Sequence, residues 1–353
     1  MEPPIGQSIT LINPDHWSMG SMMHCEKVTV SAPADAIKVW NDGDSTYCLR
    51  RKPEPITNQL PPPGDSTAGK FYDCAACAGG YVIGKNTICK IKSWAVGTAS
   101  EALTMEFVRK NLPSIPTPEP YCYWVDEAWN RSYLLMQRAP GQSLENAWKR
   151  LTEGQKKRIA AELASHVKTL AQFKSPRLES VDGHGLAEVH LLHGVEGHDT
   201  SLPHWTPEIH PTFTPAQLRS YLLRKDGVEA PSIGEEFYLY HNDLGPTNFF
   251  VVDPIPDEEN GLPLLSTIID WEGAGYFPLW WIGTKPFASA GFGLDWKEHA
   301  RPEAWVMNFT DALRQNGFDH ELEWYVPHRD LARARRRIER KRRDRDMGFE
   351  VSD

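Results

Sequence analysis

A cluster of polar residues stands directly before an apolar run in the stretch LYHNDLGPTNFFVVD, from Leu239 to Asp253. Asp243 offers a carboxylate that can take a proton from a hydroxyl, and Asn248 offers an amide oxygen that can bind a hard metal ion. His241 lies two residues before Asp243. This combination on one loop is suited to general base catalysis beside a metal ion.

A β-hairpin is expected to present this loop. The segment NFFVVDP is followed, after the polar turn IPDEENGL, by PLLSTIIDW, which ends in Asp270 and Trp271. A strand that starts after Asn248 and a paired strand that ends at Asp270 bring both oxygen ligands to the same end of the hairpin. Because Mg²⁺ takes one or two carboxylates and keeps its other positions for water and phosphate, the pattern predicts phosphoryl transfer, with Asp243 accepting the proton of the attacking hydroxyl.

The spacing H-x-D-x-x-x-x-N in HNDLGPTN, followed by IIDWE, resembles the catalytic loop and metal-binding aspartate of the protein-kinase-like fold. It is similar to the version used by aminoglycoside phosphotransferases and choline kinase-like enzymes, and DWEGAGYFP is particularly close to fungal members of that family. The resemblance implies that Asp243 is the catalytic base, that Asn248 and Asp270 hold Mg²⁺, and that His241 chiefly braces the loop. It also implies ATP as the phosphate donor.

The same resemblance implies a strand lysine that contacts the nucleotide phosphates and a helix glutamate that holds this lysine. TICKIK supplies Lys90 and SEALTMEFV supplies Glu101, with Lys92 and Glu106 as the alternatives one step along. We prefer Lys90 because two apolar residues precede it, as in the family. Glu101 is preferred because the family places a Glu-Ala pair near the helix start.

The segment SYLLMQRAPGQSL resembles the hinge of the family, so main-chain groups of Gln137, Arg138 and Ala139 are expected to meet the adenine. Gly79 and Gly80 are expected to form the turn over the phosphates, although the G-x-G-x-x-G of protein kinases is absent. The resemblance covers roughly residues 70 to 283.

A P-loop is the competing interpretation of the glycines from Gly79 to Gly84, because they read G-x-x-x-x-G-K-N up to Asn86. We reject it, since a P-loop needs Ser or Thr where Asn86 stands, and its glycines must open a helix. The strand-like TICKIK follows instead.

The surrounding pattern predicts an α+β, two-lobe, protein-kinase-like fold. KFYDCAACAGGYVIGKNTICKIK indicates two strands joined by a glycine turn, and SIPTPEPYCYWVDEAWNRSYLLMQRA indicates further strands. Between them, a helical face is predicted with Thr98 or Ser100 as its N-cap. Its apolar members are Ala102, Met105, Val108 and Leu112.

A mainly α-helical lobe with the catalytic hairpin is expected to follow, since TEGQKKRIAAELASHVKTLAQF carries apolar residues at spacings of three and four. These are Ile159, Leu163, Val167 and Leu170. The expected domains are an N-terminal extension with a Pro-rich connector (1–69), a nucleotide-binding N-lobe (70–138), a catalytic and acceptor-binding C-lobe (139–328) and a basic C-terminal tail (329–353).

The charge distribution and the composition restrict the classes of molecule that the chain is expected to bind. The net charge of the 353-residue chain is -9, but residues 329–346 hold ten Arg or Lys against four Asp or Glu, so the rest carries -15. A solvated helix or frayed end is the favoured interpretation of this tail, ahead of nucleic-acid or membrane binding. With no long apolar segment and no secretory signal, we expect a cytoplasmic protein without a membrane partner.

The C-x-x-C of Cys74 and Cys77 lacks a second ligand pair for zinc, so the cysteines are interpreted as apolar fillers.

A small-molecule kinase is therefore the first hypothesis for function. A kinase-like nucleotide-binding scaffold without turnover is the alternative, and a protein kinase is less favoured because D-F-G and a clear A-P-E are absent. The acceptor is unidentified. A set of aromatic residues after Asp270 could line a pocket for a cationic or aromatic acceptor, although about half are expected to be core. They are Trp280, Trp281, Phe287, Phe292 and Trp296.

Overall fold

Alternating buried and exposed side chains build an N-terminal antiparallel sheet. A computed structural model describes residues 3–56, 64–74, 77–192, 206–253, 264–331 and 333–334. The sheet has the order β1-β2-β3-β5-β4. Its strands are β1 (Ile9–Asn13), β2 (His16–Met19), β3 (Met23–Lys27), β4 (Lys38–Asp42) and β5 (Ser45–Arg51). In β4, for example, Trp40 is buried while Val39 and Asn41 are exposed, as expected for a strand with one face on a core.

A second antiparallel sheet follows, with the order β6-β7-β8-β10-β9. Its strands are β6 (Lys70–Cys74), β7 (Ala78–Ile83), β8 (Thr87–Ser93), β9 (Pro120–Asp126) and β10 (Arg131–Gln137). The short 3-10 turn η2 (Glu127–Trp129) and Asn130, with φ +49°, connect β9 to β10. Strands thus occur in both segments where they were predicted, but the first segment holds three strands, β6, β7 and β8, where two were predicted.

The predicted position of one turn is wrong. Gly79 and Gly80 lie inside strand β7, where they pair with Ile91 and Lys90 of β8. The glycine at a turn is Gly84, whose φ of +72° favours a residue without a side chain. At Gly80, packing excludes a side chain instead, because a Cβ at this position would lie 2.7 Å from Cζ of Phe71.

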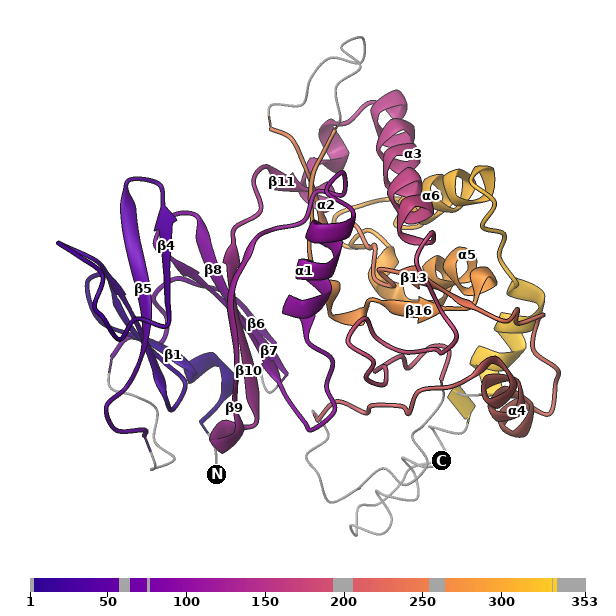
Figure 1. Cartoon of the computed structure of the whole chain (residues 1–353). Helices are drawn as coiled ribbons and strands as arrows, with labels where there is room; N and C mark the ends of the chain where they lie inside the picture. Colours follow the sequence, from indigo (N-terminus) through magenta and orange to yellow (C-terminus); the bar gives the residue numbers. More distant parts are fainter. Residues whose placement is uncertain are drawn as a thin grey trace, which may run out of the picture. The chain divides into compact units, whose positions relative to one another are not determined.

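Figure 1 shows the two sheets next to each other, and buried side chains from both form one apolar core. The N-terminal sheet contributes side chains such as Trp17, Cys25 and Leu49, and the second sheet contributes others such as Cys89 and Leu135. Residues that alternate with Cys89 on β8, including Lys90, therefore face away from this core. The beginning of the chain is held in place too, because the buried Arg131 guanidinium donates to the carbonyls of Pro3 and Pro4 and to Ser8 Oγ.

Helix α1 (Glu101–Asn111) begins where Ser100 Oγ accepts the Leu103 N–H at 3.3 Å. Ser100 is one of the two predicted N-caps, and Thr98 is not used as one. The four predicted face residues, Ala102, Met105, Val108 and Leu112, are all buried. The sequence therefore predicted the buried face of this helix and narrowed its start to two residues.

The chain divides into two compact units. The first holds both sheets and α1 and comprises residues 1–140, 197–208 and 266–272. The second comprises residues 141–196, 209–265 and 273–353. Its helices are α2 (Leu144–Ala147), α3 (Glu153–Leu170), α4 (Pro215–Asp226), α5 (Leu279–Ala288) and α6 (Ala304–Gln315), with 3-10 turns η3 (Trp148–Arg150) and η6 (Ala290–Phe292), and residues 322–331 are also helical.

Capping residues explain where two of these helices begin. Thr152 and Gln155 form a capping box at α3, and Thr214 and Gln217 form one at α4. The predicted stripe of α3, from Ile159 to Leu170, is buried. Among the described residues no helix is long and apolar enough to cross a lipid bilayer.

Short strands complete the second unit: β11 (Gln142–Ser143), β12 (Lys174–Ser175), β13 (Phe237–Tyr240), β14 (Phe249–Val251) and β16 (Gly275–Phe277). β12, β13 and β16 form one sheet. β14 belongs to the predicted hairpin, since the Val252 N–H donates to the Leu264 carbonyl at 2.9 Å just before β15 (Leu265–Ile268). The predicted turn at 255–262 and nearly all of the basic tail lie outside the described residues.

Candidate active site

Lys90 lies on the face of β8 opposite the shared core and meets three carboxylates. Its Nζ donates to Glu101 Oε2 at 2.8 Å and to Asp270 Oδ1, and it lies 3.1 Å from Glu272 Oε2. Glu101 is the first residue of α1, and its other oxygen accepts the Trp271 N–H at 3.2 Å. Lys92, two residues along the same face, bonds only to Glu272 among these carboxylates. The structure thus places Lys90, and not Lys92, against Glu101.

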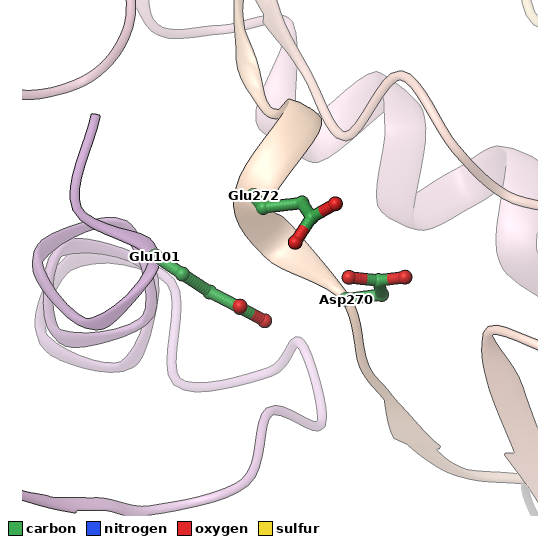
Figure 2. A group of neighbouring side chains, drawn as sticks. All are labelled: Glu101, Asp270 and Glu272. Atoms are coloured by element: carbon green, nitrogen blue, oxygen red, sulfur yellow. The ribbon is translucent and has the colours of Figure 1, made fainter. Parts of the chain in front are cut away.

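The three carboxylates point into a common space (Figure 2). One oxygen from each of Glu101, Asp270 and Glu272 lies within 4.8 Å of the others. Glu101 comes from the start of α1, whereas Asp270 and Glu272 come from the segment after β15. Because oxygen donors of this kind suit Mg²⁺, the group fits a hard cation. Glu272 was not singled out from the sequence, although its place two residues after Asp270 in IIDWE was a usable signal.

The charges of this group are strongly coupled. Burial alone would lower the pKa of Lys90, but the carboxylates of Asp270, Glu101 and Glu272 outweigh this effect and hold that pKa well above its usual value. Lys90 is therefore a permanent cation. Asp270 has a φ of +68°, a left-handed conformation uncommon for a residue with a side chain. Backbone of this kind is tolerated where the surroundings hold it, and it concentrates at functional sites.

A small pocket of about 140 Å³ adjoins the end of β10. Gln137, Arg138 and Ala139, the three predicted hinge residues, line it together with Pro116 to Pro118, Pro140, Ser266 and Thr267. The Gln137 N–H donates to Glu119 O and the Arg138 N–H to Asn86 O. No hydrogen bond of the Ala139 main chain occurs among the described residues. Ala139 therefore has both a donor and an acceptor available at this pocket.

The catalytic-loop residues come together in the second unit. Asn248 Nδ2 donates to the Asp243 carboxylate at 2.8 Å and to the Asp243 carbonyl at 3.0 Å. The Asp243 N–H donates to His241 Nδ1 at 3.3 Å, and His241 is fully buried. With its NH₂ group turned to Asp243, Asn248 directs its amide oxygen away from that carboxylate. The loop thus holds the Asp243 carboxylate through the Asn248 amide group, while Asn248 Oδ1 accepts the Thr247 hydroxyl at 3.2 Å.

Close packing also limits this loop. A Cβ at Gly245 would collide with the carbonyl oxygen of Gly291, so only glycine fits there. The Trp305 indole N–H donates to the Leu244 carbonyl at 3.2 Å. The backbone after Asp243 is therefore held on both sides.

The aromatic residues expected near the acceptor have different roles in packing. Trp280, Trp281 and Phe292 are buried core residues. Phe287 is partly buried against the His320 ring, and Trp296 is 74% exposed with Lys297 over its ring. Only these last two remain accessible enough to meet a ligand.

The fold and these side-chain groups define a class: an α+β chain with a strand lysine held by a helix glutamate in one unit and an H-x-D-x-x-x-x-N loop in the other. The phosphotransferase enzyme family matches residues 33–281. The chain belongs to this family, and the predicted resemblance is confirmed. The match begins well before residue 70 and includes β4 and β5. It also confirms the α+β, two-lobe, protein-kinase-like fold and identifies a phosphotransferase of the kinase type.

Two Aspergillus fumigatus proteins, both described as subtelomeric hrmA-associated cluster proteins, are 31% identical to this chain over 105 residues. The aligned part is 28% of this chain and 20% of each relative, so the chain matches about a fifth of the length of these curated relatives.

Solved structures show a more distant similarity. The crystal structure of aminoglycoside-3'-phosphotransferase of type VIII is 15% identical, with a TM-score of 0.42, over 74% of this chain and 93% of that one. The GDP complex of wild-type aminoglycoside 2'-phosphotransferase-IIIa is 14% identical, with a TM-score of 0.40, over 78% of this chain and 85% of that one. At this level, the assignment of the fold rests on the family match and on the elements described above.

Proposed function

We propose that this chain is an ATP- and Mg²⁺-dependent kinase that transfers the γ-phosphoryl group to a hydroxyl of a small molecule, with Asp243 as the catalytic base. The observation that carries the proposal is the Lys90 ammonium held by Glu101 and Asp270. In kinases of this fold such a lysine contacts the nucleotide phosphates. Family membership supports the general reaction, and the residues on the two units support the assigned roles.

The donor set fits Mg²⁺. Asp270 offers the kind of oxygen that Mg²⁺ prefers, and Glu272 of the same unit adds a second candidate. The proposed role of Asn248 as a further ligand rests on the family pattern alone. When bound, Mg²⁺ would neutralise negative charge that develops on the phosphate oxygens. Glu101 is better assigned to holding Lys90, because both of its oxygens already accept protein donors.

Asp243 is assigned to the acceptor hydroxyl. As the acceptor oxygen bonds to the γ-phosphorus, the bond from that phosphorus to the β–γ bridging oxygen breaks and ADP leaves. The Asp243 carboxylate takes the hydroxyl proton. Asn248 keeps the carboxylate oriented through the 2.8 Å hydrogen bond to Oδ2.

The adenine is assigned to the pocket lined by Gln137, Arg138 and Ala139, where the Ala139 main chain can both donate and accept. Gly79 and Gly80 stay candidates for phosphate contact through strand β7 rather than through a turn. Gly80 pairs directly with Lys90, so its backbone lies beside the lysine that we assign to the phosphates.

A cationic or aromatic small molecule remains the proposed acceptor class. The chain outside the basic tail is acidic, which favours cationic or neutral acceptors over anionic ones. Trp296 is an exposed aromatic face in the second unit, which also carries Asp243.

The test is a turnover screen with Mg²⁺-ATP. Candidate acceptors are aminoglycosides, choline-like amines, sugars, and indole or polyketide alcohols, and products are read by ³¹P NMR or mass spectrometry. We expect a phosphorylated product with at least one acceptor, and about 10² to 10⁴-fold slower formation of it with the Asp243→Asn variant.

A thermal shift with and without Mg²⁺-ATP measures nucleotide binding. Together with the turnover screen, it separates an active kinase from a protein that only binds nucleotide. Stabilisation by Mg²⁺-ATP, with neither transfer nor ATP hydrolysis for any acceptor, would favour the inactive scaffold over the kinase. No stabilisation and no turnover would contradict nucleotide binding altogether.

A further inference from the structure

A buried ion pair lies beside the catalytic loop in the second unit. Lys285 Nζ donates to Glu188 Oε2 at 2.6 Å, and the two residues are 5% and 2% exposed. Burying two charges is costly, and well-packed apolar residues in their place are often as stable or more stable. The pair therefore needs an explanation other than stability alone.

The Glu188 carboxylate links three segments. One oxygen accepts the N–H groups of His190 at 2.7 Å and Leu191 at 3.4 Å. The other accepts from Lys285 on α5 and from Asn242 Nδ2. Burial alone would raise the pKa of Glu188, but the Lys285 ammonium and these hydrogen bonds outweigh it and hold the pKa below its usual value. The carboxylate is thus an ionised acceptor for a residue of the catalytic loop.

Asn242 is held at both ends of its amide. Its Nδ2 donates to Glu188, and its Oδ1 accepts the Trp281 indole N–H at 3.1 Å. It is 4% exposed, and its φ is +69°. Asparagine tolerates this left-handed conformation better than most residues with side chains. Two fixed partners on opposite ends of the amide stabilise that conformation against the extended one.

The conformation of Asn242 sets the direction of the next residue. Asp243 follows it directly, and the Asp243 N–H donates back across Asn242 to His241 Nδ1. A change of φ at Asn242 would rotate the Asp243 carboxylate away from Asn248. We propose that Glu188 and Lys285 form a clamp on Asn242 and are positioning residues for Asp243, an inference that rests on the proposed role of Asp243 as base.

The test measures kcat, the KM for ATP and the unfolding midpoint of several variants. Lys285→Met should lower kcat by about 10- to 100-fold and change the KM for ATP by less than about 3-fold, because misplacing a reacting group costs rate and not nucleotide binding. Lys174→Met is the matched control, since Lys174 forms an exposed ion pair with Glu236 in the same unit. We expect the control to keep the wild-type kcat.

The double variant Glu188→Gln with Lys285→Met separates positioning from folding. Removing both charges should bring the unfolding midpoint back toward wild type, because no unpaired buried charge is left. If the pair positions the loop, kcat stays low in this double variant. If the pair is only structural, kcat recovers together with the midpoint.

Asn242→Gly tests whether the pair acts through Asn242. Glycine adopts a positive φ without a clamp, so Lys285→Met should change kcat by less than about 2-fold in the Asn242→Gly background. The same fold-loss in both backgrounds would overturn the proposal.

Amide hydrogen exchange of the peptide covering 239–248 gives a readout without turnover. We expect faster exchange in Lys285→Met than in wild type or Lys174→Met. If wild type shows this protection but transfers no phosphate, the proposed function fails and the clamp stands. If the protection is unchanged by Lys285→Met, the clamp itself fails.

Discussion

Two groups of charged residues in this molecule differ in their charge balance and in their exposure to solvent. Around Lys90 in the first unit, Lys90 and Lys92 face Glu101, Asp270 and Glu272, so negative charge is in excess. The group is only partly buried, with side chains up to 37% exposed at Glu272. An accessible group with unbalanced charge can exchange its partners for a metal ion or phosphate at modest cost.

The group around Glu188 in the second unit is closed. Its one carboxylate and one ammonium balance, both residues are buried, and every Glu188 oxygen has protein donors. Such a group is too well satisfied to bind a ligand, and breaking it leaves a charge unpaired. Carboxylate and ammonium groups can therefore serve ligand binding where they are open and unbalanced, and can orient a neighbouring residue where they are buried and balanced.

The largest expected effect comes from Asp243, the residue that the closed group orients. Asp243→Asn should lower kcat by about 10² to 10⁴-fold, the range for general acid–base catalysis. The KM for ATP should change little, because Asp243 acts on the acceptor. Steady-state kinetics check this, with the exposed Asp311→Asn on α6 as the control. A variant that turned over at the wild-type rate would remove Asp243 as the base.

Lys90 and Lys92 form a matched pair within the open group. They lie on the same face of β8, but Lys90 alone bonds to Glu101 and Asp270. Lys90→Met should lower kcat/KM for ATP by roughly 10² to 10³-fold, as the loss of one electrostatic contact to the transition state does. Lys92→Met should have a much smaller effect. Equal losses in the two variants would contradict the assignment of Lys90 to the phosphates.

Asp270 should matter for magnesium-dependent nucleotide binding. In wild type, Mg²⁺-ATP at 100 times its Kd should stabilise the protein by about 2.7 kcal/mol. Asp270→Ala should lose most of the part of this stabilisation that depends on Mg²⁺. Thermal shifts with ATP, with and without Mg²⁺, measure the difference. A full magnesium-dependent shift in the variant would exclude Asp270 as a ligand.

The smallest expected effect is a change in the pH dependence of stability, and it concerns His210, which belongs to the same unit as the closed group around Glu188. Burial lowers its pKa to about 4, and its buried Nε2 has no hydrogen-bond partner. The unfolded state thus binds a proton near the usual histidine pKa of about 6.5, which the folded state does not, so stability falls as pH drops. Between about pH 7 and pH 5 this loss is about 2 kcal/mol.

Urea unfolding of His210→Phe checks this value. The variant should lose about 2 kcal/mol less between the two pH values than wild type, whereas His320→Gln, at an exposed position, should behave as wild type. Identical pH dependence in His210→Phe and wild type would show that folding does not lower the pKa of His210.

The sequence could predict the parts of the site that lie close together along the chain. Asp243 and Asn248 share one loop, and their spacing carries the family pattern. A helix with Thr98 or Ser100 as its N-cap was predicted from local capping and periodicity, and in the structure Ser100 caps it. The pairing of Lys90 with Glu101 also followed the family pattern, although the roles of these residues remain predictions.

Other features depend on contacts that no local pattern reveals. Glu188 and Lys285 are 97 residues apart, and the only signal was one lysine in the apolar helix LWWIGTKPFA. Gly79 and Gly80 have a composition typical of a turn, but pairing with β8 and the Phe71 ring over Gly80 place them in a strand. The N-terminal sheet was missed because its pairing with itself and its packing on the second sheet are non-local.

The core shared by the two sheets has a practical consequence for protein production. A fragment trimmed to begin at Lys70 would keep every proposed nucleotide contact, but would expose the apolar face that includes Tyr81, Cys89 and Leu135 to water. Large exposed apolar faces promote self-association. We therefore expect such a fragment to precipitate during purification, so the first fifty residues belong in any preparation meant to bind nucleotide.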